Sequence, residues 1–224
     1  DITPAGLSSL SMPMRLFVLT LYNLGRLSVP LFLFLTGYLM LGREYKSNDI
    51  YKFYKTKVFH LVTITWIWTT VYYFIGVATG DHQFSLTGLA KYILFLNSTW
   101  AAPHIWYMSM IIGIYLFIPF VSNALQEMDK RVLIVLMSLM ILYTFLAPTL
   151  GTAMLATDRA PLTGRLDMSY SGGIYGVLMI VGYLVKRYWS RLKNLKILCP
   201  ITIAIAGLIA TIAWHYLIAV VWGY

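Results

Sequence analysis

Long runs of apolar residues alternate along the chain with short polar connections. The runs cover about residues 15 to 41, 58 to 79, 104 to 124, 132 to 150, 171 to 187 and 197 to 221. Each approaches or exceeds the roughly 20 residues that an α-helix needs to cross the hydrocarbon core of a bilayer. The pattern therefore predicts an all-α protein, a polytopic bundle of about six transmembrane helices.

Two segments depart from this simple pattern. The fifth run is the shortest and carries four glycines, which either weaken the helix or let a neighbouring helix approach closely: Gly172, Gly173, Gly176 and Gly182. In the connection from 80 to 103, apolar residues recur at helical spacing, which predicts a short helix lying at the membrane interface.

The composition agrees with a membrane protein. Of the 224 residues 59% are apolar and only 11% are charged, whereas about 25% are charged in soluble domains. A net charge of +9 would also fit a nucleic-acid-binding protein, so the positions of the cations decide between the two. They lie mostly in the polar connections, and we therefore expect membrane lipids, and no nucleic acid, as partners.

The Lys and Arg residues are distributed unevenly over those connections. Alternate connections hold twelve of the seventeen: Arg43, Lys46, Lys52, Lys55, Lys57, Lys130, Arg131, Lys186, Arg187, Arg191, Lys193 and Lys196. Cytoplasmic loops collect Lys and Arg, so these three connections are predicted to be cytoplasmic and both chain ends to lie outside. Because the chain opens with Asp1, without a signal region, we expect an earlier membrane helix to precede it.

Arg26 is the most informative single residue, because it lies about eleven residues into the first apolar run. A guanidinium there costs roughly 2.5–3.5 kcal/mol on insertion scales, so it should face protein or water and contact an anion or an acyl carrier. The alternative is that the helix begins near Leu27 and leaves Arg26 at the interface. Pro30, four residues later, predicts a kinked or broken helix.

Histidines supply the other candidates. His104 begins the third run. A neutral imidazole there can exchange a proton near pH 7. The alternative is a hydrated histidine at the membrane interface without a chemical role. Lys57 and His60 share a helix face at the cytoplasmic boundary, where they fit a phosphate or a lipid headgroup equally well. His215, in the last run, is interpreted as a packed residue.

The apolar runs contain no Asp or Glu. This argues against a proton-driven transport relay and against a metal site built from carboxylates. Neither a Walker lysine loop nor a dinucleotide fingerprint nor a zinc-ligand spacing occurs. We therefore expect neither a metal nor a bound cofactor.

Four stretches together resemble one family. The segment RLSVPLFLFLTGYLML, from Arg26 to Leu41, is similar to the arginine, Val-Pro and Phe-x-x-Ser-Gly-Tyr signature of membrane acyltransferase family 3. YKTKVFHLVTITW resembles the family's basic entry into the next helix, and HIWYMSMIIGIYLFIPFV resembles its His-x-Trp-Phe helix. SGGIYGVLMIVGYLVKR is similar, more weakly, to a later glycine-rich helix.

The resemblance covers about Arg26 to Arg187 and implies a bundle of roughly ten helices. It makes residues 1–224 one partial membrane domain that lacks an N-terminal helix and C-terminal helices, and we expect this piece alone to be inactive. The resemblance implies an integral O-acyltransferase of the bacterial inner or plasma membrane. Its donor would be acetyl-CoA or another acyl-CoA, and its acceptor a hydroxyl of an extracytoplasmic glycan or lipid-linked sugar.

The resemblance also implies roles for particular residues. Arg26 would stabilise the developing negative charge, Lys57 and His60 would approach the phosphates of coenzyme A, and His104 would line the acceptor side. Residues in the matching motifs are expected to bind substrate or donor as well: Thr36, Tyr38, Trp106 and Tyr107. The sequence departs from the family pattern at three places. Thr36 stands where the family usually has Ser, and Leu33 stands where it has a second Phe. Lys57 to His60 takes the place of the family's Arg-x-x-Arg pattern. The histidine that the family's first helix supplies has no equivalent here, so the catalytic base would lie upstream of Asp1.

Two other functions are open at this stage. One is a transporter of a small molecule or glycan lipid, favoured by the interrupted helix at Pro30 and opposed by the lack of intramembrane acids. The other is a membrane module of a larger protein that handles substrate without acylating it. Transfer of the acyl group by the complete protein would distinguish the enzyme from both.

Overall fold

The computed structural model describes residues 6, 10–97, 102–157, 159–160, 173–193 and 198–218. Every regular element within them is a helix, and the predicted all-α bundle is confirmed. Within these described residues, four helical stretches are long and apolar enough to cross a membrane: Met12–Met40, Ser47–Thr79, Ile105–Glu127 and Lys130–Leu155. Thr202–Tyr216 is a shorter apolar helix, so about six spans remain consistent with the structure.

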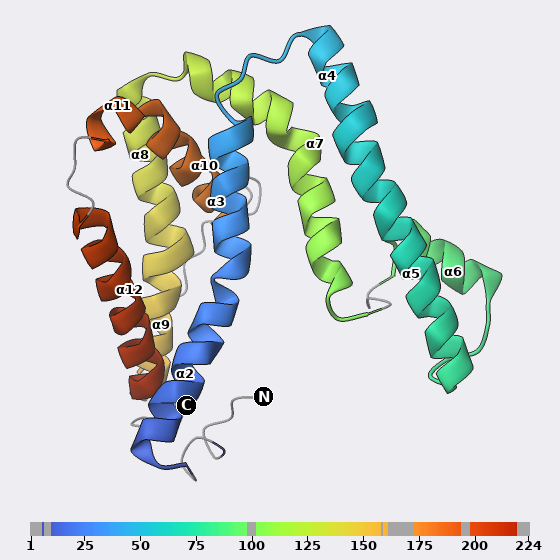
Figure 1. Cartoon of the computed structure of the whole chain (residues 1–224), viewed down its shortest axis with the longest axis horizontal. Coiled ribbons are helices and arrows are strands. Elements are labelled where there is room, and N and C mark those ends of the chain that lie inside the picture. The colour runs from blue at the N-terminus through green and yellow to red at the C-terminus, as the bar shows by residue number, and fades with distance from the viewer. Residues whose placement is uncertain are drawn as a thin grey trace. The chain divides into compact units, whose positions relative to one another are not determined.

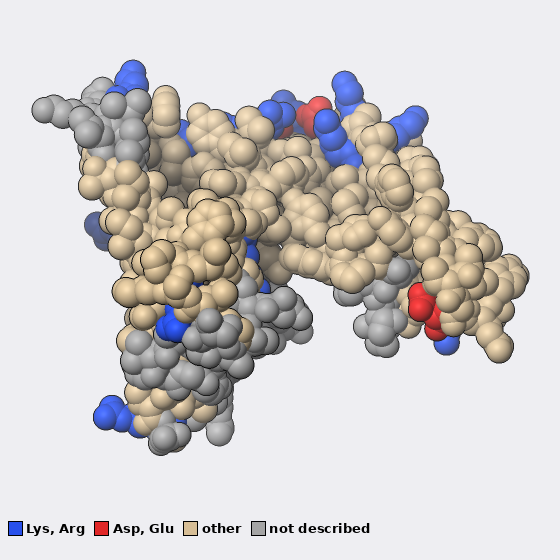
Figure 2. Space-filling view, turned by 60° about the horizontal axis from the view of Figure 1, so that its bottom comes forward, with Lys and Arg blue, Asp and Glu red and all other residues tan. Residues whose placement is uncertain are grey.

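The chain forms two compact units, Asp1–Gly42 with Met128–Tyr224, and Arg43–Glu127. In the first unit α12 runs beside α2 and α10 beside α3, and in the second unit α5 runs beside α7 (Figure 1). The visible flanks of the helices are mostly neutral, and the Lys and Arg side chains gather mainly near helix ends (Figure 2). This distribution suits helices whose sides face lipid and whose ends face water.

The first unit begins with two helices in line, α2 (Met12–Arg26) and α3 (Ser28–Met40), which are separated at Leu27. Then follow α8 (Lys130–Ile141), the π-helical turn η2 (Leu142–Leu146) and α9 (Ala147–Leu155), which together form one stretch. The unit is completed by α10 (Gly173–Arg187), α11 (Trp189–Leu192) and α12 (Leu198–Tyr216). In this unit α10 packs along α3, and α12 packs along α2.

Glycine makes the contact between α3 and α10 possible. A Cβ atom on Gly37 would collide with the backbone carbonyl of Met179, and one on Gly182 would collide with the carbonyl of Phe34. Small residues let transmembrane helices approach this closely. Of the two interpretations open for these glycines, close packing holds at Gly182, whereas Gly173 has nothing within 4 Å and Gly172 lies outside the described residues.

The end of α3 is held by the same neighbour. Gly42 takes a left-handed conformation, with φ of 76°, over the ring of Tyr183. The ammonium of Lys186 donates to the carbonyl oxygen of Leu41 at 3.2 Å. A cation at a helix C-terminus is favourable because the unpaired carbonyls carry partial negative charge. Lys186 therefore caps α3.

The second unit consists of α4 (Ser47–Phe53), the π-helical turn η1 (Tyr54–Val58), α5 (Phe59–Thr79), α6 (Leu86–Ile93) and α7 (Ile105–Glu127). The first three are continuous, so the helix begins at Ser47. The helix thus extends beyond the predicted apolar run of about 58 to 79, because charged side chains end an apolar run without ending the backbone hydrogen bonding. The short helix expected between 80 and 103 is present as α6.

An extended segment before α4 is fastened to α7 by side chains. The hydroxyl of Ser122 accepts from the backbone N–H of Arg43 at 3.1 Å and donates to its carbonyl at 2.6 Å. The amide of Asn123 pairs in the same way with the backbone of Tyr45, at 2.9 and 3.0 Å. Burial raises the pKa of the Tyr45 phenol, whose ring packs against Phe53. Four hydrogen bonds thus fix the entry into α4.

Candidate functional site

Arg26 is the last residue of α2 and lies at the break between two helices. Pro30 has no N–H to donate to the Arg26 carbonyl, which its ring also crowds. The backbone adapts with a bond from Leu27 N–H to the Leu24 carbonyl at 3.2 Å, and the Ser28 hydroxyl donates to Gly25 O at 3.0 Å. The helix break predicted around Pro30 is confirmed.

Arg26 is the fifteenth residue of the 29-residue apolar stretch Met12–Met40. The hydrogen-bonded helix begins well before Leu27, since α2 makes four turns up to Arg26. A helix of this length covers more than the roughly 30 Å of a hydrocarbon core. In a membrane crossed by this stretch, Arg26 would lie near mid-depth.

The Arg26 guanidinium forms a cation–π contact with an aromatic ring. The guanidinium carbon lies 4.4 Å from the centroid of the Tyr22 ring, one helical turn earlier. Such a contact stabilises by about 0.5–1 kcal/mol when exposed and about 2 kcal/mol or more when desolvated. The side chain is otherwise exposed, and neither α2 nor α12 contains an Asp or Glu that would neutralise it. Within the described part of the chain, one face of the Arg26 guanidinium is therefore open to an anionic group.

His215 of α12 reaches the same ring. Its imidazole meets the Tyr22 ring in an edge-to-face arrangement, with centroids 6.0 Å apart. Its Nδ1 atom is buried and has no hydrogen-bond partner among the described residues. The sequence interpretation of His215 as an ordinary packed residue missed this proximity. No signal in the sequence pairs α12 with α2, whereas Tyr22 could have been found from its spacing to Arg26.

Thr36 and Tyr38 lie on α3, ten and twelve residues beyond Arg26. The Thr36 hydroxyl is buried and donates to the Phe32 carbonyl at 2.8 Å. Tyr38 is half-buried and meets Trp189 of α11 edge to face, with ring centroids 6.5 Å apart. Helical rise places these residues about 15–18 Å from Arg26, so the three do not form one cluster.

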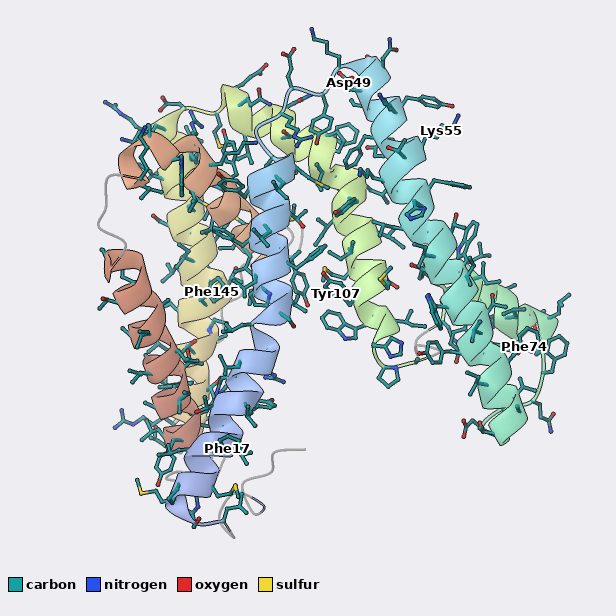
Figure 3. All side chains as sticks on the ribbon, in the orientation of Figure 1. Phe17, Asp49, Lys55, Phe74, Tyr107 and Phe145 are labelled. Atoms are coloured by element: carbon teal, nitrogen blue, oxygen red, sulfur yellow. The ribbon has the colours of Figure 1, made fainter. Side chains whose placement is uncertain are left out.

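Lys57 and His60 lie where the π-helical turn η1 passes into α5, and both are exposed. Lys55 of the same turn projects away from α7 (Figure 3). Lys55, Lys57 and His60 are therefore accessible to a phosphate group. The Tyr54 hydroxyl holds the turn against α7 by donating to the Leu116 carbonyl at 2.7 Å.

His104 precedes α7 and lies beside α5, where its ring is 4.9 Å from that of Tyr72 in an edge-to-face contact. His104 and Trp106 are exposed and Tyr107 is half-buried, with the Trp106 and Tyr107 rings 5.9 Å apart. Tyr72 lies twelve residues after His60 on one helix, which corresponds to about 18 Å. Within this unit, Lys57 and His60 therefore lie far from the cluster formed by His104, Trp106 and Tyr107.

The two groups of predicted residues thus fall in different units. Arg26, Thr36 and Tyr38 belong to the first, and the second contains Lys57, His60, His104, Trp106 and Tyr107. Among the described residues, no three His, Cys, Asp or Glu side chains are grouped closely enough to hold a metal ion. What the first unit offers chemically is a cation, a phenol and an imidazole in a largely apolar setting.

Comparison with known proteins identifies a family. The family model described as an acyltransferase domain, which corresponds to the family that the sequence motifs resemble, covers residues 4–224. No curated protein and no solved structure matches the chain.

Proposed function

We propose that this chain, which belongs to membrane acyltransferase family 3, is part of an integral membrane O-acyltransferase that moves a short acyl group from acyl-CoA to a hydroxyl of a cell-surface glycan. The match over residues 4–224 is the observation that carries the proposal. The proposed location is the bacterial inner or plasma membrane. The proposed donor is acetyl-CoA or another acyl-CoA, and the proposed acceptor is an extracytoplasmic or lipid-linked sugar.

The chemistry explains why such an enzyme needs Arg26. When a hydroxyl oxygen attacks the carbonyl carbon of a thioester, negative charge develops on the carbonyl oxygen before the C–S bond breaks. A fixed cation aimed at that oxygen lowers the barrier, most strongly where water is excluded. Arg26, held over Tyr22 with a free face, suits this role.

The depth of Arg26 fits a donor that enters from the inner side. Arg26 precedes Leu41, the residue capped by Lys186, by fifteen residues, or about 22 Å of helix. The pantetheine arm of coenzyme A is long enough to span a distance of that order while its charged nucleotide stays in water. An acyl group could therefore reach Arg26 without the phosphates entering the hydrocarbon core.

The remaining candidates take the roles that their positions allow. Lys57 and His60 are exposed next to other lysines, and we assign them to the phosphates of coenzyme A. His104, in its contact with Tyr72, is assigned with Trp106 and Tyr107 to the acceptor side. Thr36 and Tyr38 lie on α3 between Arg26 and Leu41, and we assign them to the donor.

Replacing Arg26 tests the proposal. In membranes containing the full-length protein, transfer of labelled acetyl from acetyl-CoA to glycan is measured for wild type, Arg26→Gln and Arg26→Lys. We expect Arg26→Gln to lower kcat by about 10²–10³-fold, the usual effect of losing one oxyanion-stabilising group. Arg26→Lys should retain part of the activity, because it keeps the charge and loses the planar fork.

The control is Arg159→Gln, because Arg159 is exposed and follows α9. Its kcat should equal that of wild type. Normal kcat in Arg26→Gln would remove the oxyanion role. A wild-type protein that transfers no acyl group from any acyl-CoA would overturn the proposed function.

A further inference from the structure

The connection between α5 and α7 contains α6 (Leu86–Ile93), whose contacts fix how far it runs back along α5. We propose that α6 is a re-entrant helix, which enters the outer half of the membrane and ends near mid-depth, covered there by hydrocarbon chains of the outer leaflet. The sequence predicts a helix lying at the membrane interface. The inference goes beyond the proposed function and depends only on α5 crossing the membrane with the polarity predicted from the Lys and Arg residues.

Two side chains of α5 hold the two ends of α6. At its start, the Tyr73 hydroxyl accepts from the backbone N–H of Ser85 and donates to the Ser85 carbonyl, both at 2.9 Å. At its end, the indole N–H of Trp66 donates to the Ile93 carbonyl at 2.9 Å. The partner on α5 thus moves backwards along the chain as α6 moves forwards. Figure 1 shows the chain turning at the end of α5 and α6 lying beside that helix.

The length of α5 gives the depth of these contacts. The helix ends at Thr79, and exposed polar residues follow it, among them Gln83. Lys57, at the other boundary, precedes Thr79 by twenty-two residues, or about 33 Å of helix, which matches one hydrocarbon core. Trp66 precedes Thr79 by thirteen residues, or about 20 Å. Ile93, which is bonded to Trp66, therefore lies nearer to mid-depth than to the outer surface.

The end of α6 is built for surroundings without water. The last four carbonyls of an α-helix have no partner within it, and hydrocarbon supplies none. In α6 each of the four accepts a hydrogen bond from the protein: Ala90 from Leu94 N–H at 2.9 Å, Lys91 from Leu96 N–H at 2.8 Å, Tyr92 from Phe95 N–H at 3.2 Å, and Ile93 from Trp66.

The first three of these bonds come from the turn that closes the helix. Phe95 takes the left-handed conformation, with φ of 56°, that such a turn requires. The turn provides no donor for the Ile93 carbonyl, and the indole of α5 supplies it. At a surface in contact with water this fourth carbonyl would need no protein partner, because water would hydrate it.

The outward side of α6 and of the turn after it is apolar. Leu86, Leu94 and Leu96 have exposed fractions of 73%, 59% and 71%. Large apolar side chains grouped on a surface indicate a contact with a protein or a membrane. At the depth set by Trp66, acyl chains of the outer leaflet surround such a surface, so hydrocarbon is the partner that fits it.

Lys91, the one charged residue of α6, is compatible with this position. Its side chain is exposed. Side chains on a helix lean toward its N-terminus, which in α6 is the outer end. The stem of Lys91 can therefore run outward through the hydrocarbon and bring the ammonium to the headgroups.

The same measure of depth applies to His104. Its ring contacts Tyr72, which precedes Thr79 by seven residues, or about 10 Å of helix. His104 therefore lies below the outer end of α5. Under the proposed acyl transfer, an acceptor that meets His104 would enter the outer leaflet near α6.

The test places a nitroxide spin label on Leu96→Cys in the full-length protein, with other cysteines replaced, in phospholipid bilayers. Its accessibility to oxygen, which concentrates in hydrocarbon, and to a water-soluble nickel chelate is measured by electron paramagnetic resonance. Ile67→Cys, beside Trp66 and 57% exposed, is the lipid reference, and Gln83→Cys, also exposed, is the water reference. The oxygen-to-nickel ratio of Leu96→Cys should equal that of Ile67→Cys and exceed that of Gln83→Cys.

A label on Leu86→Cys, at the outer end of α6, measures the tilt of the helix. Its ratio should fall between those of Gln83→Cys and Leu96→Cys. Equal ratios at Leu86→Cys and Leu96→Cys would mean that α6 lies parallel to the surface, and would overturn the inference. A ratio at Leu96→Cys like that of Gln83→Cys would overturn it as well.

A third result would also contradict the proposal. Low accessibility of Leu96→Cys to both reagents would mean that protein, rather than lipid, covers the end of α6. None of these measurements uses enzymatic activity. A protein that transfers no acyl group would therefore overturn the proposed function and leave the position of α6 to be decided by the labels.

Discussion

At the scale of single residues, the side chains of Ser122 and Asn123 form hydrogen bonds of the kind that backbone groups usually form. They supply the four hydrogen bonds that an extended segment would otherwise form in a sheet. The Ser122 hydroxyl both accepts and donates, and none of the residue is exposed. Two successive polar residues near the end of an apolar helix give no hint of this function in sequence, because their partners lie about 78 residues earlier.

The Ser122→Ala variant tests that interpretation. It leaves the N–H and carbonyl of Arg43 without their partners, so we expect a loss of about 1–3 kcal/mol in the free energy of unfolding. Thermal unfolding of the protein in detergent measures the change. Ser138→Ala, at an exposed position of α8, should leave the melting temperature unchanged. Equal melting temperatures for the two variants would show that the two hydrogen bonds of Ser122 contribute nothing to stability.

Arg26 and His215 differ in how far sequence could reveal them. A guanidinium inside an apolar run is visible without coordinates, because its insertion cost demands an explanation. A histidine near the end of another apolar run carries no such cost when neutral. Which group it contacts is decided by the packing of α12 on α2.

At the scale of elements, the packing of α3 on α10 depends on missing side chains. Gly37 and Gly182 face backbone on the opposite helix, where even a methyl group would collide. The glycines of the fifth apolar run left two interpretations open from sequence, a weak helix or close packing. The structure decides for close packing at Gly182.

Gly182→Ala should therefore weaken this helix pair. A methyl group forced against the Phe34 carbonyl requires α10 to move, and overpacking of this kind costs about 1–3 kcal/mol. Unfolding of the protein in detergent should occur at lower temperature. The control is Gly207→Ala on α12, where nothing lies within 4 Å and alanine favours the helix. A Gly182→Ala protein as stable as wild type would contradict the close approach.

The helix that starts at Ser47 shows that hydropathy does not predict where a helix begins. The predicted boundary at 58 marks where the apolar surface begins, whereas the hydrogen-bonded helix starts eleven residues earlier. Water solvates lysine side chains on a helix as readily as on a loop. The polarity of a segment therefore predicts its depth in the membrane better than its backbone conformation.

At the scale of the whole molecule, the distribution of Lys and Arg predicts the orientation of the chain. In a full-length protein whose cysteines, Cys199 among them, have been replaced, single cysteines report which side is accessible. Lys193→Cys should react with a membrane-impermeant maleimide only after cells are opened, whereas Gln83→Cys should react in intact cells, because basic loops stay in the cytoplasm. Both positions are exposed. Labelling of Lys193→Cys in intact cells would reverse the topology and remove the proposed entry side of the donor.

The amino-acid sequence by itself determined that the protein is a helical membrane bundle of this family, with a costly arginine and an interrupted helix near it. These features follow from local properties, namely the transfer free energy of side chains and the missing N–H of proline. Only the tertiary structure decided that α12 carries His215 to the Tyr22 ring, that glycines join α3 to α10, and that Ser122 and Asn123 hold a distant strand-like segment. Such pairings depend on which surfaces fit together, and residues far apart in the chain carry no local record of that fit.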